Sequence, residues 1–396
     1  MTADLLRYRD EFPILSQSTY LISSSLGAMP RRVEQALAEY AHSWATRGVR
    51  AWSERWWTMA QEVASAVAPI VGAADGTISM HQNVTTAHMV ALSTLPPPGR
   101  RNTIVCSAAD FPSLVHLFRA QEALGYRLEV IPAEPDLSVD PDRIAAAIDD
   151  RTALVAVSHV LFQSAFILDP APIVARAQAV GAPVMLDVYQ SAGIVPLNLA
   201  ALGVEFAAGG CLKWLCGGPG NAFLYARPDV LERLRPRFTG WFSHPRPFAF
   251  ETMPFEPLPD ARRLANGTPC IPAYYAALPG LRLIREVGVE RIRAASMQLT
   301  SRLLEQAVDR GFRSVASRNP ERLGGTVALD VPDALPVART LNARDFVVDY
   351  RTGVGIRLSP HFYNTADEVD AVVHEIARIV RTRDYAPGAT DPTIVT

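Results

Sequence analysis

The stretch TALVAVSHVLFQSAFILDPAPIVARAQAVGAPVMLDV, residues 152–188, decides the fold class. Its two ends, TALVAVSHV (152–160) and PVMLDV (183–188), are continuous apolar runs of strand length, and APIVARAQAVG between them has helical spacing. Continuous apolar strands that alternate with helices are typical of a mostly parallel sheet with both faces covered. The stretch therefore predicts an α/β fold.

The same alternation extends to both sides of this stretch. Further strand-like runs are NTIVCSA (102–108), RLEVIPA (127–133), EFAAGG (205–210) and NAFLYA (221–226). From residue 235 the chain is rich in proline and aromatic residues without a clear period. It continues with a long helical stretch (273–311), weaker strands in GGTVALDV (324–331) and VGIRLSP (354–360), and a closing helix (366–383). We expect a second, smaller domain in this C-terminal part.

Composition and charge limit the classes of function. The 396 residues are 49% hydrophobic and 20% charged, as in ordinary globular proteins, with 38 basic and 40 acidic residues. This balance argues against binding to nucleic acid or to an anionic membrane surface. The charged N-terminal residues and the lack of any run near 18 apolar residues argue against a signal peptide and a membrane span. We expect a cytoplasmic protein whose partners are small molecules and copies of itself.

The four cysteines, Cys106, Cys211, Cys216 and Cys270, fit a reducing compartment as buried thiols. Cys211 and Cys216 lack the spacing of a zinc or redox motif, and no matching pair of histidines or cysteines lies near them in the sequence. We therefore expect no metal site.

A single lysine stands in the glycine-rich, apolar stretch GGCLKWLCGGPG, residues 209–220. Lys213 follows the strand-like EFAAGG, at the carboxyl end of a strand, where open α/β sheets bind ligands. An isolated lysine of this kind is usually one whose stem is buried and whose head reaches water. The apolar neighbours favour a second interpretation, a partly desolvated amine with a lowered pKa that reacts with an aldehyde.

Asp187 ends the strand-like PVMLDV and has two explanations, a cap or turn acceptor or a functional anion. In an enzyme that uses pyridoxal phosphate, an acid at this place pairs with the pyridine nitrogen and keeps the ring protonated. Gln190 either reaches the phenolic oxygen of such a ring or caps the next helix, and spacing does not choose between the two.

Two further segments fit a phosphorylated, planar cofactor. Thr85 and Thr86 lie where a helix begins in SMHQNVTTAHMVALSTL (79–95). Either the backbone N–H groups and the two hydroxyls converge there to bind a phosphate, or one of the two threonines only caps the helix. Phe111 follows a strand, where it either covers a planar ring or, as is more usual for a single phenylalanine, belongs to the core. His81, His88 and His244 are acid–base candidates by residue type only.

Eight motifs, in the family's order, resemble the class V branch of fold-type I pyridoxal phosphate enzymes, and within it kynureninase and its relatives. They are YLISSSLGAMPRRV, NVTTAHMVAL, DFPS, DVYQSAG, GGCLKWLCGGPG, GWFSH, NGTP and VGIRLSPHFYNT. The resemblance implies a large cofactor-binding domain with a mostly parallel sheet and a smaller α+β C-terminal domain. We accordingly divide the chain into an N-terminal segment (1–35) that packs with the small domain, a large domain (36–270) and a small domain (271–396).

The resemblance also implies the roles of individual residues around pyridoxal 5'-phosphate. Lys213 corresponds to the lysine that holds the cofactor covalently, Asp187 to the partner of the pyridine nitrogen, and Arg357 to the bidentate clamp of the substrate α-carboxylate. The other implied cofactor contacts are Phe111 on the ring, Val84, Thr85 and Thr86 at the phosphate, Ser158 and Gln190 nearby, and Trp241 and Thr268 from the partner subunit of a homodimer with shared active sites.

Departures from the family pattern bear on the reaction. Kynureninases usually carry tyrosine before the lysine and histidine three residues after the aspartate, where this chain has Leu212 and Gln190. The tyrosine is a candidate proton relay for cleavage beside an aryl ketone. Glutamine occurs at the second position in cysteine desulfurases, but those need a nucleophilic cysteine well beyond the lysine, and none follows Cys270.

These departures favour β-elimination from a cysteine conjugate, as in carbon–sulfur lyases of specialised metabolism that are similar to this family. The alternatives within the family are Cβ–Cγ hydrolysis as in kynureninase, transamination, decarboxylating deamination and epimerisation of an amino acid. The alternative outside catalysis is a silent partner subunit of the same fold.

Overall fold

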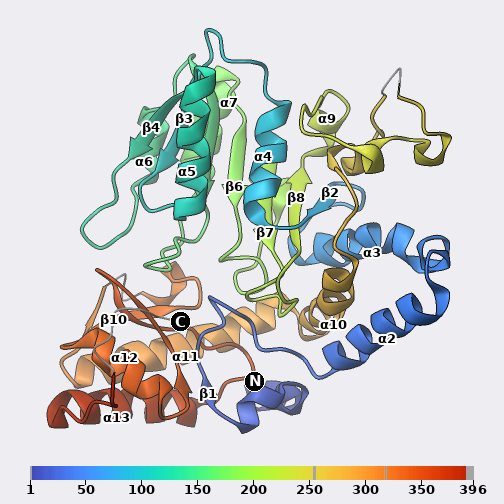
Figure 1. Cartoon of the computed structure of the whole chain (residues 1–396). Coiled ribbons are helices and arrows are strands. Elements are labelled where there is room, and N and C mark those ends of the chain that lie inside the picture. The colour runs from blue at the N-terminus through green and yellow to red at the C-terminus, as the bar shows by residue number, and fades with distance from the viewer. Residues whose placement is uncertain (1, 253–255, 316, 318, 389–396) are drawn as a thin grey trace.

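A computed structural model describes residues 2–252, 256–315, 317 and 319–388. Within these residues a seven-stranded sheet has the order β2-β8-β7-β6-β5-β3-β4 (Figure 1). Neighbouring strands are parallel except in the two pairs that involve β8. The strands are β2 Ile78–His81, β3 Thr103–Ser107, β4 Arg127–Ile131, β5 Thr152–Ser158, β6 Val184–Asp187, β7 Phe206–Gly210 and β8 Ala222–Ala226.

The predicted α/β fold with a mostly parallel sheet is confirmed, and β3 to β8 lie in the six runs expected to form strands. The edge strand β2 was not predicted. Its four residues alternate apolar Ile78 and Met80 with polar Ser79 and His81, which is too short a pattern to separate from the start of the following helix.

Alternate residues of β5 belong to two different core clusters. Leu154 and Ala156 pack with residues of the helices on one face, α4 (Val84–Thr94) and α5 (Pro112–Ala120). Val155 and Val157 pack with residues of α6 (Pro141–Ala146) and α7 (Ala171–Val180) on the other. Because successive side chains of a strand point to opposite faces, a run that is apolar throughout needs cover on both.

The long helical stretch predicted for 273–311 is two helices, α10 (Ile271–Val287) and α11 (Val289–Asp309), which separate at Gly288 with φ +87°. A left-handed φ of this kind ends a helix and is easiest for glycine. α10 packs on α2 (Arg32–Arg47) and α3 (Trp57–Val67) beside the sheet. Cys270, directly before α10, is exposed, so the expectation of a buried thiol is wrong there, whereas the other three thiols are buried.

A second, four-stranded antiparallel sheet of order β12-β13-β10-β9 forms the C-terminal part of the described chain. Its strands are β9 Arg313–Ser314, β10 Val327–Asp330, β12 Asp349–Arg351 and β13 Gly355–Leu358. The helices α12 (Ala334–Asn342) and α13 (Ala366–Thr382) pack against each other, and α13 also packs on α11. The remaining α-helices of the described residues are α1 Thr2–Leu5, α8 Leu199–Leu202 and α9 Pro228–Leu231, and several short 3-10 helices lie between the elements named.

The N-terminal segment packs on this C-terminal part (Figure 1). β1 (Thr19–Tyr20) pairs in parallel with β11 (Phe346–Val347), and Arg9 forms an ion pair with Glu368. The ring of Phe12 lies 4.4 Å from that of Tyr363. The division into 1–35, 36–270 and 271–396 stays a prediction.

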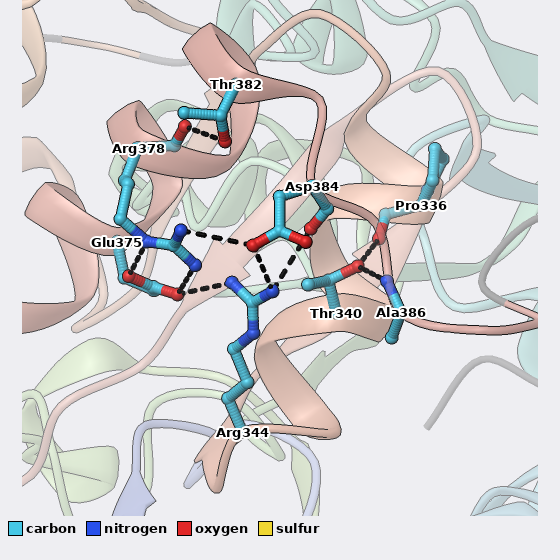
Figure 2. A network of polar contacts seen from close by, with 8 residues as sticks. All are labelled: Pro336, Thr340, Arg344, Glu375, Arg378, Thr382, Asp384 and Ala386. Carbon is cyan, nitrogen blue, oxygen red and sulfur yellow. Dashed lines mark hydrogen bonds and ion pairs between the residues drawn. The ribbon is translucent and has the colours of Figure 1, made fainter.

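A network of charged side chains lies at the C-terminal end of α13 (Figure 2). Glu375 of α13 accepts hydrogen bonds from Arg378 and Arg344, and both arginines also bind Asp384 beyond the helix. The bonds from Arg378 lower the pKa of Glu375 from 4.5 to about 2. A carboxylate with a lowered pKa stabilises the fold above its ordinary pKa, and this stabilisation is lost as the pH falls from about 4.5 towards 2.

Candidate active site

Lys213 and Asp187 lie at one edge of the large sheet. β6 ends at Asp187, β7 ends shortly before Lys213, and the two strands run in parallel with Asp187 opposite Ala208. Parallel neighbours end at the same edge of a sheet, which is where open α/β sheets bind ligands. The strand pairing therefore brings the ammonium group and the carboxylate into electrostatic range of each other.

The surroundings of the Lys213 amine lower its pKa from 10.5 to about 7. Burial is the main cause, because desolvation disfavours the charged form; Asp187 acts in the opposite direction, and Arg357 adds repulsion. The predicted lowering of this pKa is confirmed. A large share of the amine is neutral near pH 7, the form that attacks a carbonyl or removes a proton.

Two aromatic rings lie beside the Nζ atom of Lys213. The centroid of Tyr189 is 4.4 Å from it, and that of Phe111 is 5.8 Å away. The Phe111 side chain is 42% exposed and meets Phe162 edge-on, so the interpretation of Phe111 as a core residue is wrong. Its ring is open to a planar group at this edge of the sheet.

Asp187 is buried, and burial raises its pKa to about 6, an effect reduced by a hydrogen bond from the Tyr189 N–H and by the charge of Lys213. His88 of α4 lies 4.0 Å from Asp187 Oδ2, but burial lowers the His88 pKa to about 4, so this contact is not an ion pair at neutral pH. The Nδ1 of His88 donates to the Val84 carbonyl, which leaves Nε2 as an acceptor towards Asp187. Oδ2 therefore faces no donor from His88.

Gln190 connects three parts of the chain. Its Nε2 donates to the Ser24 carbonyl at 3.0 Å, and its Oε1 accepts from the Trp214 indole at 3.1 Å. His361 donates from Nε2 to the carbonyl of Trp214 at 2.9 Å. No helix begins at Gln190, so the interpretation as a cap is wrong; contact with a phenolic oxygen stays a prediction. The amide braces the residue that follows Lys213.

Ser158 ends β5 and lies opposite Asp187 in the register of β5 and β6. Its N–H donates to Asp110 Oδ1 at 2.7 Å, and Oδ2 of the same carboxylate accepts from the Ser107 N–H at 2.8 Å. Asp110 thus ties together the ends of β3 and β5. The sequence reasoning did not identify it, because only the pairing of the strands reveals both partners.

The helix α4 begins at Val84, and its cap is Asn83 rather than a threonine. Asn83 Oδ1 accepts from the backbone N–H of Thr86 at 2.9 Å and from its hydroxyl at 3.1 Å. The first-turn N–H groups of Val84 and Thr85 have no acceptor within a helix, as at any helix start. Two backbone donors and the positive end of the helix dipole remain for an anion.

Arg357 of β13 is 2% exposed and therefore not a surface arginine. Its Nε and Nη2 atoms both bind Oδ2 of Asp349, which is fully buried; Nη2 also donates to the Ser25 hydroxyl at 3.1 Å and Nη1 to the carbonyl of Phe162. Asp349 Oδ1 lies 2.8 Å from Nη1 of Arg351 and forms an ion pair with it, but the angles are not those of a hydrogen bond. One edge of the Arg357 guanidinium is thus already taken by a carboxylate.

Trp241 and Thr268, by contrast, lie in exposed segments. The Trp241 indole donates to the Pro247 carbonyl, and its ring belongs to an aromatic group with Trp57, Phe248 and Phe250. Phe248 and Phe250 are 62% and 72% exposed. A contact between Trp241 or Thr268 and a cofactor of a partner subunit stays a prediction.

A cavity of about 220 Å³ lies between α3, β2 and the segment around Phe242. Its lining includes His81, His244 and Tyr274 but neither Lys213 nor Asp187. The site at Lys213 is therefore identified by its chemistry rather than by this hollow.

In the part of the chain that the structure describes, no three side chains of His, Cys, Asp or Glu are grouped so that they could hold a metal ion. Nor does any helix among those residues have the length and apolar character needed to cross a membrane.

The pair Asp349–Arg357 provides a test of stability. We expect Asp349→Asn to lower the free energy of unfolding by about 3–5 kcal/mol, because it leaves a buried guanidinium without its counter-charge. Asp330→Asn, which breaks the exposed pair Arg313–Asp330 on the same small sheet, is the control and should cost less than about 1 kcal/mol. Urea denaturation of both variants measures the difference, and equal losses would contradict this account of Arg357.

The family model described as "Aminotransferase class-V" matches residues 19–372. "Uncharacterized aminotransferase YcbU" of Bacillus subtilis (strain 168) is 30% identical over 94% of this chain and 97% of that protein. "Kynureninase" of Bacillus anthracis is 28% identical over 96% of this chain and 93% of its own length.

Among solved structures, the fold is similar to that of a cysteine desulfurase from Thermococcus onnurineus NA1, with a TM-score of 0.83 and 23% identity over 95% of this chain and 98% of that one. It is also similar to the cystine C-S lyase C-DES, with a TM-score of 0.83 and 22% identity over 95% of this chain and all of that one. At these identities the likeness shows the fold alone. The match over residues 19–372 and the 30% identical relative show that the chain is a member of the class V aminotransferase family of pyridoxal phosphate-dependent enzymes.

Proposed function

We propose that this enzyme is a lyase that expels a sulfur substituent from Cβ of an α-amino acid, a carbon–sulfur lyase that acts on a cysteine conjugate. The observation that carries the proposal is the position of Lys213. It is the only lysine in the 396 residues, and its desolvated amine lies next to Asp187 and within the electrostatic range of Arg357. No other side chain of the protein offers an amine to an aldehyde.

The residues around Lys213 fit pyridoxal phosphate. Lys213 would hold the cofactor covalently, and Asp187 Oδ2, which receives no hydrogen bond from His88, would accept a hydrogen bond from the protonated ring nitrogen. When bound, the cofactor supplies an electron-accepting ring that stabilises negative charge at Cα of the substrate. Asp187 would keep that ring protonated.

The other end of the cofactor would lie at α4. The N–H groups of Val84 and Thr85 would bind its phosphate at the positive end of the helix, with Thr86 beside them. Ser158 would lie close to the ring, because it stands opposite Asp187 in the sheet. The exposed face of Phe111 would cover the ring.

Arg357 would bind the α-carboxylate of the substrate. Asp349 holds the Nε and Nη2 edge, Nη2 also donates to Ser25, and one N–H of Nη1 donates to the Phe162 carbonyl. The contact would therefore be made through the second N–H of Nη1. This differs from a free bidentate clamp. Asp349 fixes the direction of the guanidinium, because both groups are buried and share two hydrogen bonds.

The bond that breaks follows from the groups near Lys213. The amino group of the substrate would first replace Lys213 in the bond to the cofactor, which frees the lysine as a neutral amine. This amine would remove the Cα proton, and the Cβ–S bond would break with its electron pair on sulfur. A thiolate leaves without an acid, since thiols have a pKa of about 8.5. The overall reaction converts a cysteine conjugate and water into a thiol, pyruvate and ammonium.

Hydrolysis beside an aryl ketone needs more acid–base assistance, and two positions argue against it. Leu212 cannot carry a proton, and Gln190 has no titratable group and is bonded to Ser24 and Trp214. The kynureninase relatives, at 28% identity, nevertheless make this hydrolysis the second candidate, and the relative named as an aminotransferase adds transamination.

We further propose a homodimer in which Trp241 and Thr268 of each subunit contact the phosphate of the other. The aromatic group around Trp241 supports this, because Phe248 and Phe250 present large apolar rings to solvent in the single chain. Exposed apolar patches of this kind mark contact surfaces.

The first prediction concerns the covalent link. Purified protein with pyridoxal phosphate should absorb at roughly 410–430 nm, and borohydride should fix the cofactor on the peptide that contains Lys213. Lys213→Ala and Lys213→Arg should both lack the band and lose turnover by on the order of 10³-fold or more. The arginine variant keeps the positive charge, so it separates loss of the amine from loss of charge. A Lys213→Ala variant with full turnover would falsify the proposal.

The second prediction concerns the reaction. S-substituted cysteines should give pyruvate and free thiol in equal amounts, whereas kynurenine should give no anthranilate and a pair of amino acid and keto acid should exchange no amine. Product analysis by chromatography separates the three outcomes. If the protein carries the cofactor band but releases pyruvate from no cysteine conjugate, elimination is the wrong reaction.

The third prediction concerns pH. In the protein without cofactor, the rate at which added pyridoxal phosphate develops the band should rise with pH to a plateau, with a midpoint near the Lys213 pKa of about 7. The direction follows because only the neutral amine attacks the aldehyde, and burial makes the amine neutral at lower pH than usual. A rate that keeps rising in proportion to hydroxide up to pH 9 would show an ordinary lysine.

The fourth prediction concerns shared sites. Lys213→Ala and the double variant Trp241→Ala/Thr268→Ala should each have little activity alone. After unfolding and refolding together they should regain about a quarter of wild-type activity, because half of random dimers are hybrids and each hybrid contains one intact site of two. Mixing without refolding is the control. No gain after joint refolding would refute the sharing of residues.

A further inference from the structure

The aromatic ring of Tyr189 lies next to the Lys213 amine, and the sequence alone suggested no role for this residue. Its ring centroid lies 4.4 Å from Nζ, closer than that of Phe111 at 5.8 Å. It comes from the turn after β6, two residues beyond Asp187, whereas Phe111 precedes α5. Two rings from different strand ends therefore flank the same nitrogen atom.

The position of the Tyr189 ring is fixed from two sides. Its backbone N–H donates to Asp187 Oδ1 at 2.9 Å, which holds the turn against the buried carboxylate. Its side chain lies on the backbone of Gly210 at the end of β7, where an added Cβ would come within 2.2 Å of the ring atom Cε2. Only glycine leaves room for the ring at that point of the strand.

The ring rather than the hydroxyl of Tyr189 meets Lys213. Burial raises the pKa of the phenol, so it stays neutral at working pH. The hydroxyl makes no hydrogen bond to any residue that the structure describes. The contact with Nζ is instead that of a cation over an aromatic face, which stabilises positive charge on the nitrogen.

We propose that Tyr189 is a second aromatic positioning residue of the cofactor site, whose ring face supports the carbon–nitrogen link between pyridoxal phosphate and Lys213. The inference rests on the proposed attachment of the cofactor to Lys213. Tyr189 contributes in two ways. It gives the planar group a second surface next to the reacting nitrogen, and it favours the protonated form of the link.

The test uses the dissociation constant of pyridoxal phosphate and the pH midpoint of its absorbance band, neither of which depends on the substrate. Tyr189→Ala should weaken cofactor binding about 5- to 30-fold and lower the pH midpoint at which the band loses its proton. Tyr189→Phe keeps the ring and should match wild type in both. Thermal melting of each variant without cofactor shows whether the fold is intact.

Gly210→Ala gives an independent test that keeps the tyrosine. The added methyl group should displace the ring from Nζ and weaken cofactor binding in the same direction as Tyr189→Ala. In the Tyr189→Ala background it should add no further loss, because the ring it displaces is gone. Comparing the effect of Gly210→Ala on cofactor binding in the two backgrounds separates displacement of the ring from a general loss of stability in one variant.

The outcomes separate this inference from the proposed function. A wild-type protein without the absorbance band would overturn the attachment itself. A wild-type band with unchanged binding in Tyr189→Ala would overturn only the role of Tyr189. Equal losses in Tyr189→Phe and Tyr189→Ala would show that the hydroxyl acts and would likewise refute a role for the ring face.

Discussion

The arrangement of the molecule depends on holding one partly desolvated amine at the carboxyl ends of the parallel strands of the large sheet. Burial makes the charged form of Lys213 costly, and the charge of Asp187 only partly compensates. The surrounding segments all serve this desolvation. The N-terminal segment approaches so closely that a Cβ on Gly27 would lie 2.1 Å from the Lys213 carbonyl oxygen, while the Gly27 N–H donates to the Leu212 carbonyl. The N-terminal segment therefore packs directly on the backbone of Leu212 and Lys213.

The C-terminal part contributes to the same enclosure through buried polar groups, His361 in the loop after β13 and Arg357 on β13 itself. His361 binds the carbonyl of Trp214, and the indole of Trp214 binds Gln190, so the residue after the lysine is held from two sides. Arg357 extends from the small sheet to the Phe162 carbonyl in the loop after β5. These contacts join the two sheets near Lys213, so the relative position of the sheets affects the surroundings of its amine.

Much of this could be predicted from the sequence, because its causes are local. Uniformly apolar runs predicted the strands β3 to β8, and the apolar setting of Lys213 predicted its lowered pKa. The presence of only one lysine in the chain was a further signal that the sequence reasoning missed. Asp110 could not be found in this way, and His88 was named by residue type only, without its contact to Asp187. Asp110 matters because β3 and β5 are neighbours in the sheet, and His88 because α4, which packs on β7 and β8, brings it to Asp187 at the end of β6. Neither relation can be read from residues that are close together in the sequence.

The helix α4 connects two of these features on one rigid element. Its N-terminal N–H groups lie at Val84 and Thr85, and His88 faces Asp187 one turn further along the same helix. An α-helix advances by about 1.5 Å per residue and does not stretch. The distance along α4 from the proposed anion site to His88 is therefore fixed by the helix rather than by loop conformation, and His88 packs beside Asp187 of β6. If the proposed cofactor spans from the N-terminus of α4 to Asp187, an analogue with a longer or shorter phosphate arm would not reach both groups at once.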